Sequence, residues 1–270
     1  MTKIDSGFFD LGQMDELSRQ DTAIHRLDPR VKLITTMVFI IMVVSYGKYE
    51  LSALFPFILY PVFLCSAGRI PLSYLLKKIL LVSPFAIMIG IFNPLMDSQI
   101  HLVIGDIRIT GGWISFISIL LRFILTVGAA LSLIAVTGFN SVCEGMEKLG
   151  VPRVFTVQLM FLHRYLFVLI AEASRMLRAS NLRKPDRNGM GIRIYGSLLG
   201  HLLLRTLDRA QRIHLAMHCR GFDGHVRTIK RLRIGIPEVG FFLIWSSLFI
   251  IMRYFNISQE LGRLVTEFLV

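Results

Sequence analysis

The stretch WISFISILLRFILTVGAALSLIAVTG (residues 113–138) decides the fold class of this chain. It contains one charged side chain, Arg122. About 20 mostly apolar residues in a helix, rising ~1.5 Å each, cross the hydrocarbon core of a bilayer. The stretch therefore predicts a transmembrane helix that is long enough to span with tilt.

Four further apolar stretches predict transmembrane helices in the same way. The third of the five is interrupted by Pro84 and by the Asn93-Pro94 pair. Together they predict an all-α, polytopic integral membrane protein with about five transmembrane helices. The four stretches are residues 31–47, 50–67, 79–96 and 239–255.

Composition supports a membrane protein and argues against other classes. The chain has 270 residues, of which 54% are hydrophobic, with 30 Lys and Arg against 18 Asp and Glu. Basic nucleic-acid-binding proteins place such charge on a polar domain without long apolar runs, so we expect no nucleic acid partner. The N-terminal residues lack the pattern of a signal peptide. Three cysteines without a CxxC pair indicate neither a disulfide framework nor a zinc ribbon.

The number of Lys and Arg residues alternates between high and low along the segments that connect the predicted helices. Residues 1–32 hold five of them, residues 68–78 hold three and residues 139–237 hold 17, whereas each of the other three connecting or terminal segments holds one. Because cytoplasmic loops carry the Lys and Arg excess, we expect a cytoplasmic N-terminus and an external C-terminus. The predicted organisation is a cytoplasmic N-terminal segment (1–30), four transmembrane helices (31–138), cytoplasmic helices (139–237), and a last transmembrane helix with an external tail (238–270).

The large basic region is predicted to contain two amphipathic helices. Residues 154–182 form the first, which ends at the turn residues of RKPDRNG (183–189). The second runs from Ser197 to Arg220, with Gly221 as its left-handed C-terminal cap. Its predicted buried face consists of Leu199, Leu202, Leu203, Thr206, Ala210, Ile213 and Met217, while Arg205, Arg209 and Arg212 fall off that face.

The stretch HLAMHCRGFDG (214–224) raises the alternative of a metal site. His214 and His218 have the spacing of zinc-binding metallopeptidase helices, but Leu215 stands where the catalytic glutamate would follow. Cys219 lies about 100° round the helix from His218, and His225 lies past a glycine turn. We therefore expect no metal ligands and no catalytic residues here, and a membrane metalloenzyme built on the two histidines stays the less favoured alternative.

Two arginines near the ends of the predicted cytoplasmic helices favour a docking function. Arg220 lies in the last turn of its helix, and Arg178 lies in the final turns of the preceding one. A helix C-terminus favours a cation in any case, which accounts for one such arginine. A guanidinium also binds carboxylates or carbonyls in a bidentate way that lysine cannot match. The pair therefore suggests two ends that dock a cytosolic partner.

The sequence resembles the transmembrane T component of energy-coupling factor (ECF) transporters, most closely the cobalt-type CbiQ family. The resemblance covers essentially the whole chain. It is carried by HRLDPRVKL (25–33), RYLFVLIAEASRMLRA (164–179) and CRGFDG (219–224).

The resemblance implies a non-enzymatic, cofactor-free coupling subunit in the cell membrane. Its partners would be two ABC-type ATPase subunits and a substrate-binding S component of the cobalt type, with a small accessory membrane protein. The cargo would be cobalt ions, for cobalamin biosynthesis; nickel or a vitamin is the alternative. The ATPase-coupling residues would be Cys219, Arg220 and Gly221 in one motif and Arg178 and Ala179 in the other, with Arg183 as the fallback arginine.

Two sequence features agree with a subunit that relies on partners. The chain has no GxxxxGK[ST] loop for nucleotide phosphates. Its predicted spans contain almost no acidic residues, which a stand-alone cation permease would be expected to carry. Arg122 is the clear mid-span charge, and we expect it to hydrogen-bond a backbone carbonyl or to snorkel toward one surface.

Overall fold

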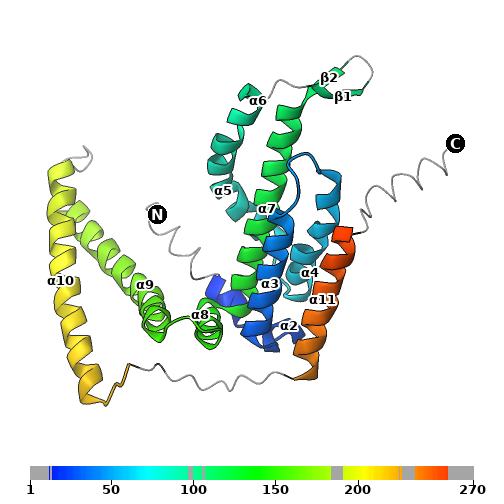
Figure 1. Cartoon of the computed structure of the whole chain (residues 1–270). Coiled ribbons are helices and arrows are strands. Elements are labelled where there is room, and N and C mark those ends of the chain that lie inside the picture. The colour runs from blue at the N-terminus through cyan, green and yellow to red at the C-terminus, as the bar shows by residue number, and fades with distance from the viewer. Residues whose placement is uncertain are drawn as a thin grey trace. The chain divides into compact units, whose positions relative to one another are not determined.

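The computed structural model describes residues 12, 14–96, 100–104, 107–183, 191–224, 226 and 235–254, and these are predominantly helical (Figure 1). The chain divides into two compact units, which we treat separately. The bundle unit comprises Asp15–Gly145 and Leu232–Val270, and the helix-pair unit comprises Met146–Arg231 with Met1–Met14. The all-α, polytopic class predicted from the sequence is confirmed.

The bundle unit contains most of the apolar helices. Its main members pack around α7, the helix that contains most of the apolar stretch 113–138. The elements, in chain order, are α2 (Ala23–Arg26), α3 (Pro29–Val44), the 3-10 helix η1 (Ser52–Ile58), α4 (Leu59–Ala67), α5 (Leu72–Gly90), α6 (Phe92–Met96), β1 (Ile100–Ile104), β2 (Ile107–Thr110), α7 (Gly111–Thr137), α8 (Phe139–Lys148, whose last residues belong to the other unit) and α11 (Ile236–Tyr254).

An aromatic cluster forms the centre of the bundle unit. Phe39 of α3 is fully buried, and its ring centroid lies 4.8 Å from that of Tyr60 in α4 and 5.4 Å from that of Phe249 in α11. Trp245 of α11 packs edge-on against Tyr60, with centroids 4.9 Å apart. Such tilted pairs add about 0.5–1.5 kcal/mol each beyond area burial. The cluster therefore joins the last apolar helix to the first ones.

The HRLDPRVKL segment builds the start of α3. The Asp28 carboxylate accepts a hydrogen bond from the backbone N–H of Arg30 at 2.9 Å, and Pro29 occupies the first helical position. These are the preferred residues for an N-cap and for position N1. Lys32 is 1% exposed and donates from Nζ to the Ile24 carbonyl at 3.2 Å. This segment thus has a structural role, because it fixes where the first apolar helix begins.

Four helices are long and apolar enough to cross a membrane, by length and composition, in the part of the chain that the structure describes. Three of them, Leu72–Pro94, Gly111–Thr137 and Ile236–Tyr254, correspond to predicted spans. The fourth is Arg153–Leu182, which was predicted to be cytoplasmic because it lies in the region with 17 Lys and Arg residues. The first two predicted spans form α3 and the η1–α4 pair, both shorter than 18 residues.

Three details of the bundle unit differ from or extend the prediction. The third apolar helix begins at Leu72, earlier than residue 79, and it contains Pro84 in its interior without ending there. The connection before α7 holds a short antiparallel hairpin, β1–β2. Arg122 donates from Nη2 to the backbone carbonyl of Gly47, in the connection after α3, at 2.5 Å, which confirms the first of the two expected arrangements, a hydrogen bond to a backbone carbonyl.

Candidate coupling site

The helix-pair unit is built around α9 (Arg153–Leu182) and α10 (Ile192–Cys219), which run antiparallel. Near one end the rings of Phe161 and Phe222 pack with centroids 6.1 Å apart. Farther along, Nη1 of Arg205 donates to Oε1 of Glu172 at 2.6 Å. Phe222, just past the end of α10, thus contacts Phe161 early in α9, so that the C-terminal ends of the two helices lie at opposite ends of the pair.

The C-terminal end of α10 is closed by a Schellman motif. The Gly221 N–H donates to the His218 carbonyl at 2.9 Å, and the Phe222 N–H donates to the Met217 carbonyl at 3.0 Å. Gly221 has a φ of +75°, a conformation that costs other residues about 1–2 kcal/mol. The position of this glycine cap matches the sequence prediction. The motif turns Phe222 back onto Phe161 and thereby anchors the turn that carries Arg220.

Replacing this glycine should loosen the end of α10. We expect Gly221→Ala to destabilise the end of the helix pair by about 1 kcal/mol, because alanine disfavours positive φ. The matched control is Gly200→Ala in the same helix, where an added methyl group meets no atom within 4 Å. There alanine should stabilise by up to about 1 kcal/mol. Amide hydrogen exchange of residues 217–222 in both variants measures the difference, and equal exchange rates would contradict this account of the cap.

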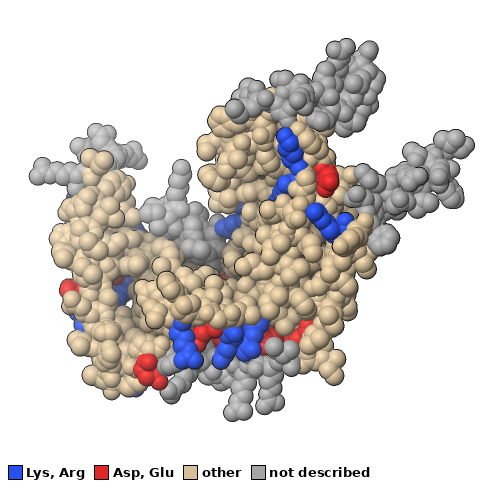
Figure 2. Space-filling model, in the orientation of Figure 1, with Lys and Arg blue, Asp and Glu red and all other residues tan. Residues whose placement is uncertain are grey.

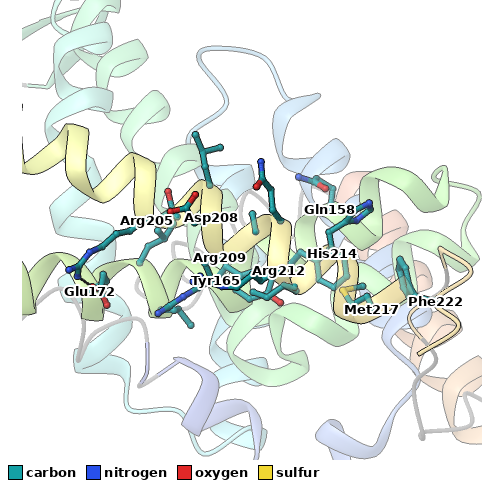
Figure 3. A pocket seen from close by; sticks show the side chains of 18 residues that line it. Gln158, Tyr165, Glu172, Arg205, Asp208, Arg209, Arg212, His214, Met217 and Phe222 are labelled. Atoms are coloured by element: carbon teal, nitrogen blue, oxygen red, sulfur yellow. Dashed lines mark hydrogen bonds and ion pairs between the residues drawn. The ribbon is translucent and has the colours of Figure 1, made fainter. Parts of the chain in front are cut away.

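A groove of about 960 Å³ lies along the helix pair (Figure 3). Its apolar lining includes Phe161, Leu169 and Met217, and its polar lining comes mainly from α10. Glu172 sits in this groove and accepts hydrogen bonds from two arginines, Arg205 of α10 and Arg175 of its own helix, the latter at 2.9 Å. The carboxylate is therefore held as a cross-link between the two helices.

The predicted buried face of α10 is partly wrong. Leu202, Thr206, Ile213 and Met217 are half-buried as expected, but Ala210 is exposed, and Leu199 and Leu203 are 65% and 60% exposed. Arg209 is half-buried in their place. The reason is that the contact with α9 lies to one side of the leucine stripe, so that α10 keeps an uncovered apolar face, completed by Leu204, Leu207 and Leu215.

The structure places the predicted coupling residues on the surface at two separate locations. Arg178, Ala179 and Arg183 are exposed at the C-terminal end of α9, and Cys219, Arg220 and Gly221 are exposed at the C-terminal end of α10. It does not bring Arg178 and Arg220 together. Extrapolating the antiparallel contacts puts Arg178 near residue 200 of α10, about 30 Å from Arg220 at 1.5 Å per residue.

The histidines of the second motif form a pair and nothing larger. Nε2 of His214 lies 3.1 Å from Nε2 of His218, and both side chains are exposed. No group of three or more His, Cys, Asp or Glu could hold a metal ion among the residues that the structure describes. His225 of the metal alternative lies outside those residues. Leu215 follows His214, so the glutamate of the metallopeptidase pattern is missing from that position.

Two features of this site were missed in the sequence. The Glu172–Arg205 cross-link joins residues 33 positions apart, which no local pattern indicates. Phe222 had a partial signal, because an apolar residue directly after a glycine cap commonly packs onto the last turn of its own helix, but its contact with Phe161 of α9 could not be predicted that way. Figure 2 shows that uncharged side chains cover most of the visible surface, with Lys and Arg gathered at a few places.

Long apolar helices joined to a basic, exposed helix pair define the class, a polytopic membrane component of a transporter. The chain belongs to the CbiQ family, described as cobalt transport protein, whose match covers residues 20–231. It is therefore a transport subunit and not an enzyme, and the metalloenzyme alternative is set aside.

Similar proteins agree with this membership. The chain is 26% identical over 216 residues to the energy-coupling factor transporter transmembrane protein EcfT of Bacillus subtilis, covering 74% of this chain and 81% of that protein. It is 25% identical over 233 residues to EcfT of Streptococcus thermophilus, covering 79% and 86%. It is also 27% identical over 239 residues to an uncharacterized protein of Methanocaldococcus jannaschii, covering 85% and 81%.

Proposed function

We propose that this chain is the coupling subunit of an ECF-type importer for cobalt ions. It would transmit ATP-driven motion from two ABC-type ATPase subunits to a separate substrate-binding S component in the membrane. One observation carries the proposal: two exposed arginine motifs, around Arg178 and Arg220, lie at opposite ends of one antiparallel helix pair.

The spacing of the motifs supports two ATPase partners. Ends about 30 Å apart at 1.5 Å per residue can each dock a separate subunit of a pair. Each arginine offers a planar fork that binds carboxylates or carbonyls of a partner. The Glu172–Arg205 ion pair and the Phe161–Phe222 contact tie the helices together, so that closure of the ATPases would move the pair as one body.

The uncovered leucine face of α10 supports a partner within or against the membrane. Leu199, Leu203 and Leu207 are all more than half exposed on a helix that otherwise carries arginines. An apolar face of this kind marks a surface for an apolar protein or for lipid. We assign it to the S component, with the small accessory membrane protein as a further member of the complex. The bundle unit would sit in the cell membrane with the N-terminus cytoplasmic.

Co-purification tests the proposal. The chain, expressed with its host's ATPases and small membrane proteins, should retain an ATPase pair and an S component through size-exclusion chromatography in detergent. Reconstituted alone, the chain should give no cobalt flux. Flux by the isolated chain would instead indicate a stand-alone permease, and purification without any ATPase would refute the coupling function.

Cobalt as the cargo is supported by the family description alone, because the S component would bind the substrate. Uptake assays of the assembled complex with Co²⁺, Ni²⁺ and vitamins distinguish the alternatives. We expect cobalt uptake that requires ATP. Uptake of nickel or of a vitamin without cobalt would leave the coupling function intact and change the cargo.

A further inference from the structure

Two exposed histidines, His214 and His218, lie side by side near the C-terminal end of α10, just before Arg220. Their Nε2 atoms lie 3.1 Å apart, and their ring planes are nearly perpendicular, at 84°. Each ring is a neutral ligand when its single proton lies on Nδ1, and the Nε2 lone pairs of both rings are then available to one ion in place of the hydrogen bond between them. The structure thus presents two nitrogen donors, from His214 and His218, already at ligand spacing on a solvent-accessible surface.

We propose that His214 and His218 form a bidentate binding site for a late first-row divalent cation, with Cu²⁺ and Ni²⁺ preferred. With metal–nitrogen bonds of about 2.0–2.1 Å, a separation of 3.1 Å gives a nitrogen–metal–nitrogen angle of about 95–102°. Such an angle allows both nitrogens to bind one ion, and imidazole ligands suit Cu²⁺ and Ni²⁺, which stand high in the general order of affinities. Co²⁺ should bind more weakly than Ni²⁺, by the general order of affinities.

The surroundings make this an open site and not a closed structural one. No third His, Cys, Asp or Glu completes a cluster among the residues that the structure describes. Cys219 is exposed but lies about 100° round the helix from His218. Water would fill the remaining positions. With only two protein ligands, binding should be reversible.

The site lies within the turn that the coupling function uses. An ion that bridges positions four apart closes a ring across the last turn of α10 and should hold that turn in its helical form. Arg220 and the Gly221 cap follow directly. This consequence rests on the proposed function, whereas metal binding by the histidines does not.

Metal titration of the full-length protein tests the site. With any purification tag removed, the detergent-solubilised chain should bind one Ni²⁺ per molecule in isothermal titration calorimetry. His218→Ala should weaken Ni²⁺ binding by at least ~10–100-fold. Loss of an outer-shell partner already costs that much, and His218 would be a direct ligand. The electron paramagnetic resonance spectrum of bound Cu²⁺ should show two nitrogen ligands, and one in the variant.

Two control variants keep the outcome decisive. His201→Ala removes an exposed histidine of the same helix and should leave Ni²⁺ affinity unchanged. Combining His218→Ala with Ala216→His keeps the number of histidines but breaks the four-residue spacing, and should lose the site. Equal Ni²⁺ binding by this variant and the native chain would overturn the proposal. Because no ATPase is present, that result would leave the role of Arg220 untouched.

Discussion

Replacing Arg220 with glutamate should separate this subunit from its ATPases without disturbing its insertion in the membrane. Arg220 is exposed at the C-terminal end of α10, so its replacement should leave the helix folded. Truncating one partner of a buried, hydrogen-bonded charge pair in an interface costs about 2–5 kcal/mol, and reversing the charge adds repulsion. We expect at least a roughly 30-fold loss of ATPase affinity and loss of transport.

Two further variants show which property of the arginine is needed. Arg220→Lys keeps the charge but loses the planar fork, so it should give an intermediate loss of ATPase affinity. Arg212→Glu makes the same charge reversal on the same exposed helix, two turns before the end, and should retain the ATPases. The measurement is the amount of ATPase retained on the immobilised membrane complex. ATPase binding and metal uptake at native levels in Arg220→Glu would refute the docking role.

Local rules predicted the ends of the helix pair closely. The first helix, expected over residues 154–182, forms as Arg153–Leu182, and the glycine cap stands at Gly221. Both depend on turn and cap residues that act over a few positions. The start of α10 at Ile192 was missed, because turn residues and Gly196 suggested a later start. The residues at the start of α10 give a less specific sequence signal than the glycine cap at its end.

Tertiary contacts explain what the sequence could not supply. The periodic leucines of α10 predicted a buried face, but which side of a helix is covered depends on where its neighbour packs. Arg209 therefore lies against α9 while Leu203 stays exposed.

The placement of Arg178 and Arg220 at opposite ends of the helix pair could have been predicted from the sequence. Helices joined by a short connection usually run antiparallel, and only nine residues, 183–191, separate α9 from α10.

The largest effect on stability should come from the aromatic cluster of the bundle unit. Phe39 is fully buried and contacts rings of α4 and α11, so Phe39→Ala leaves a cavity between three helices. Large aromatic truncations in soluble cores cost about 3–5 kcal/mol. Lipid is itself apolar and removes part of the transfer contribution, so we expect the lower end, about 3 kcal/mol. For a chain of this size that corresponds to roughly 6–12 °C in the midpoint of thermal unfolding.

The matched control is Phe85→Ala in α5, whose side chain is 63% exposed on the outside of the bundle unit. It removes the same atoms without opening a cavity, so its midpoint in detergent should stay close to that of the native chain. Equal shifts in both variants would show that the cluster does not hold α11 in place. Phe39→Ala should still bind the ATPases at low temperature, because the arginine motifs belong to the helix-pair unit. Phe39→Ala should therefore lower stability without abolishing docking, and Arg220→Glu should abolish docking without lowering stability.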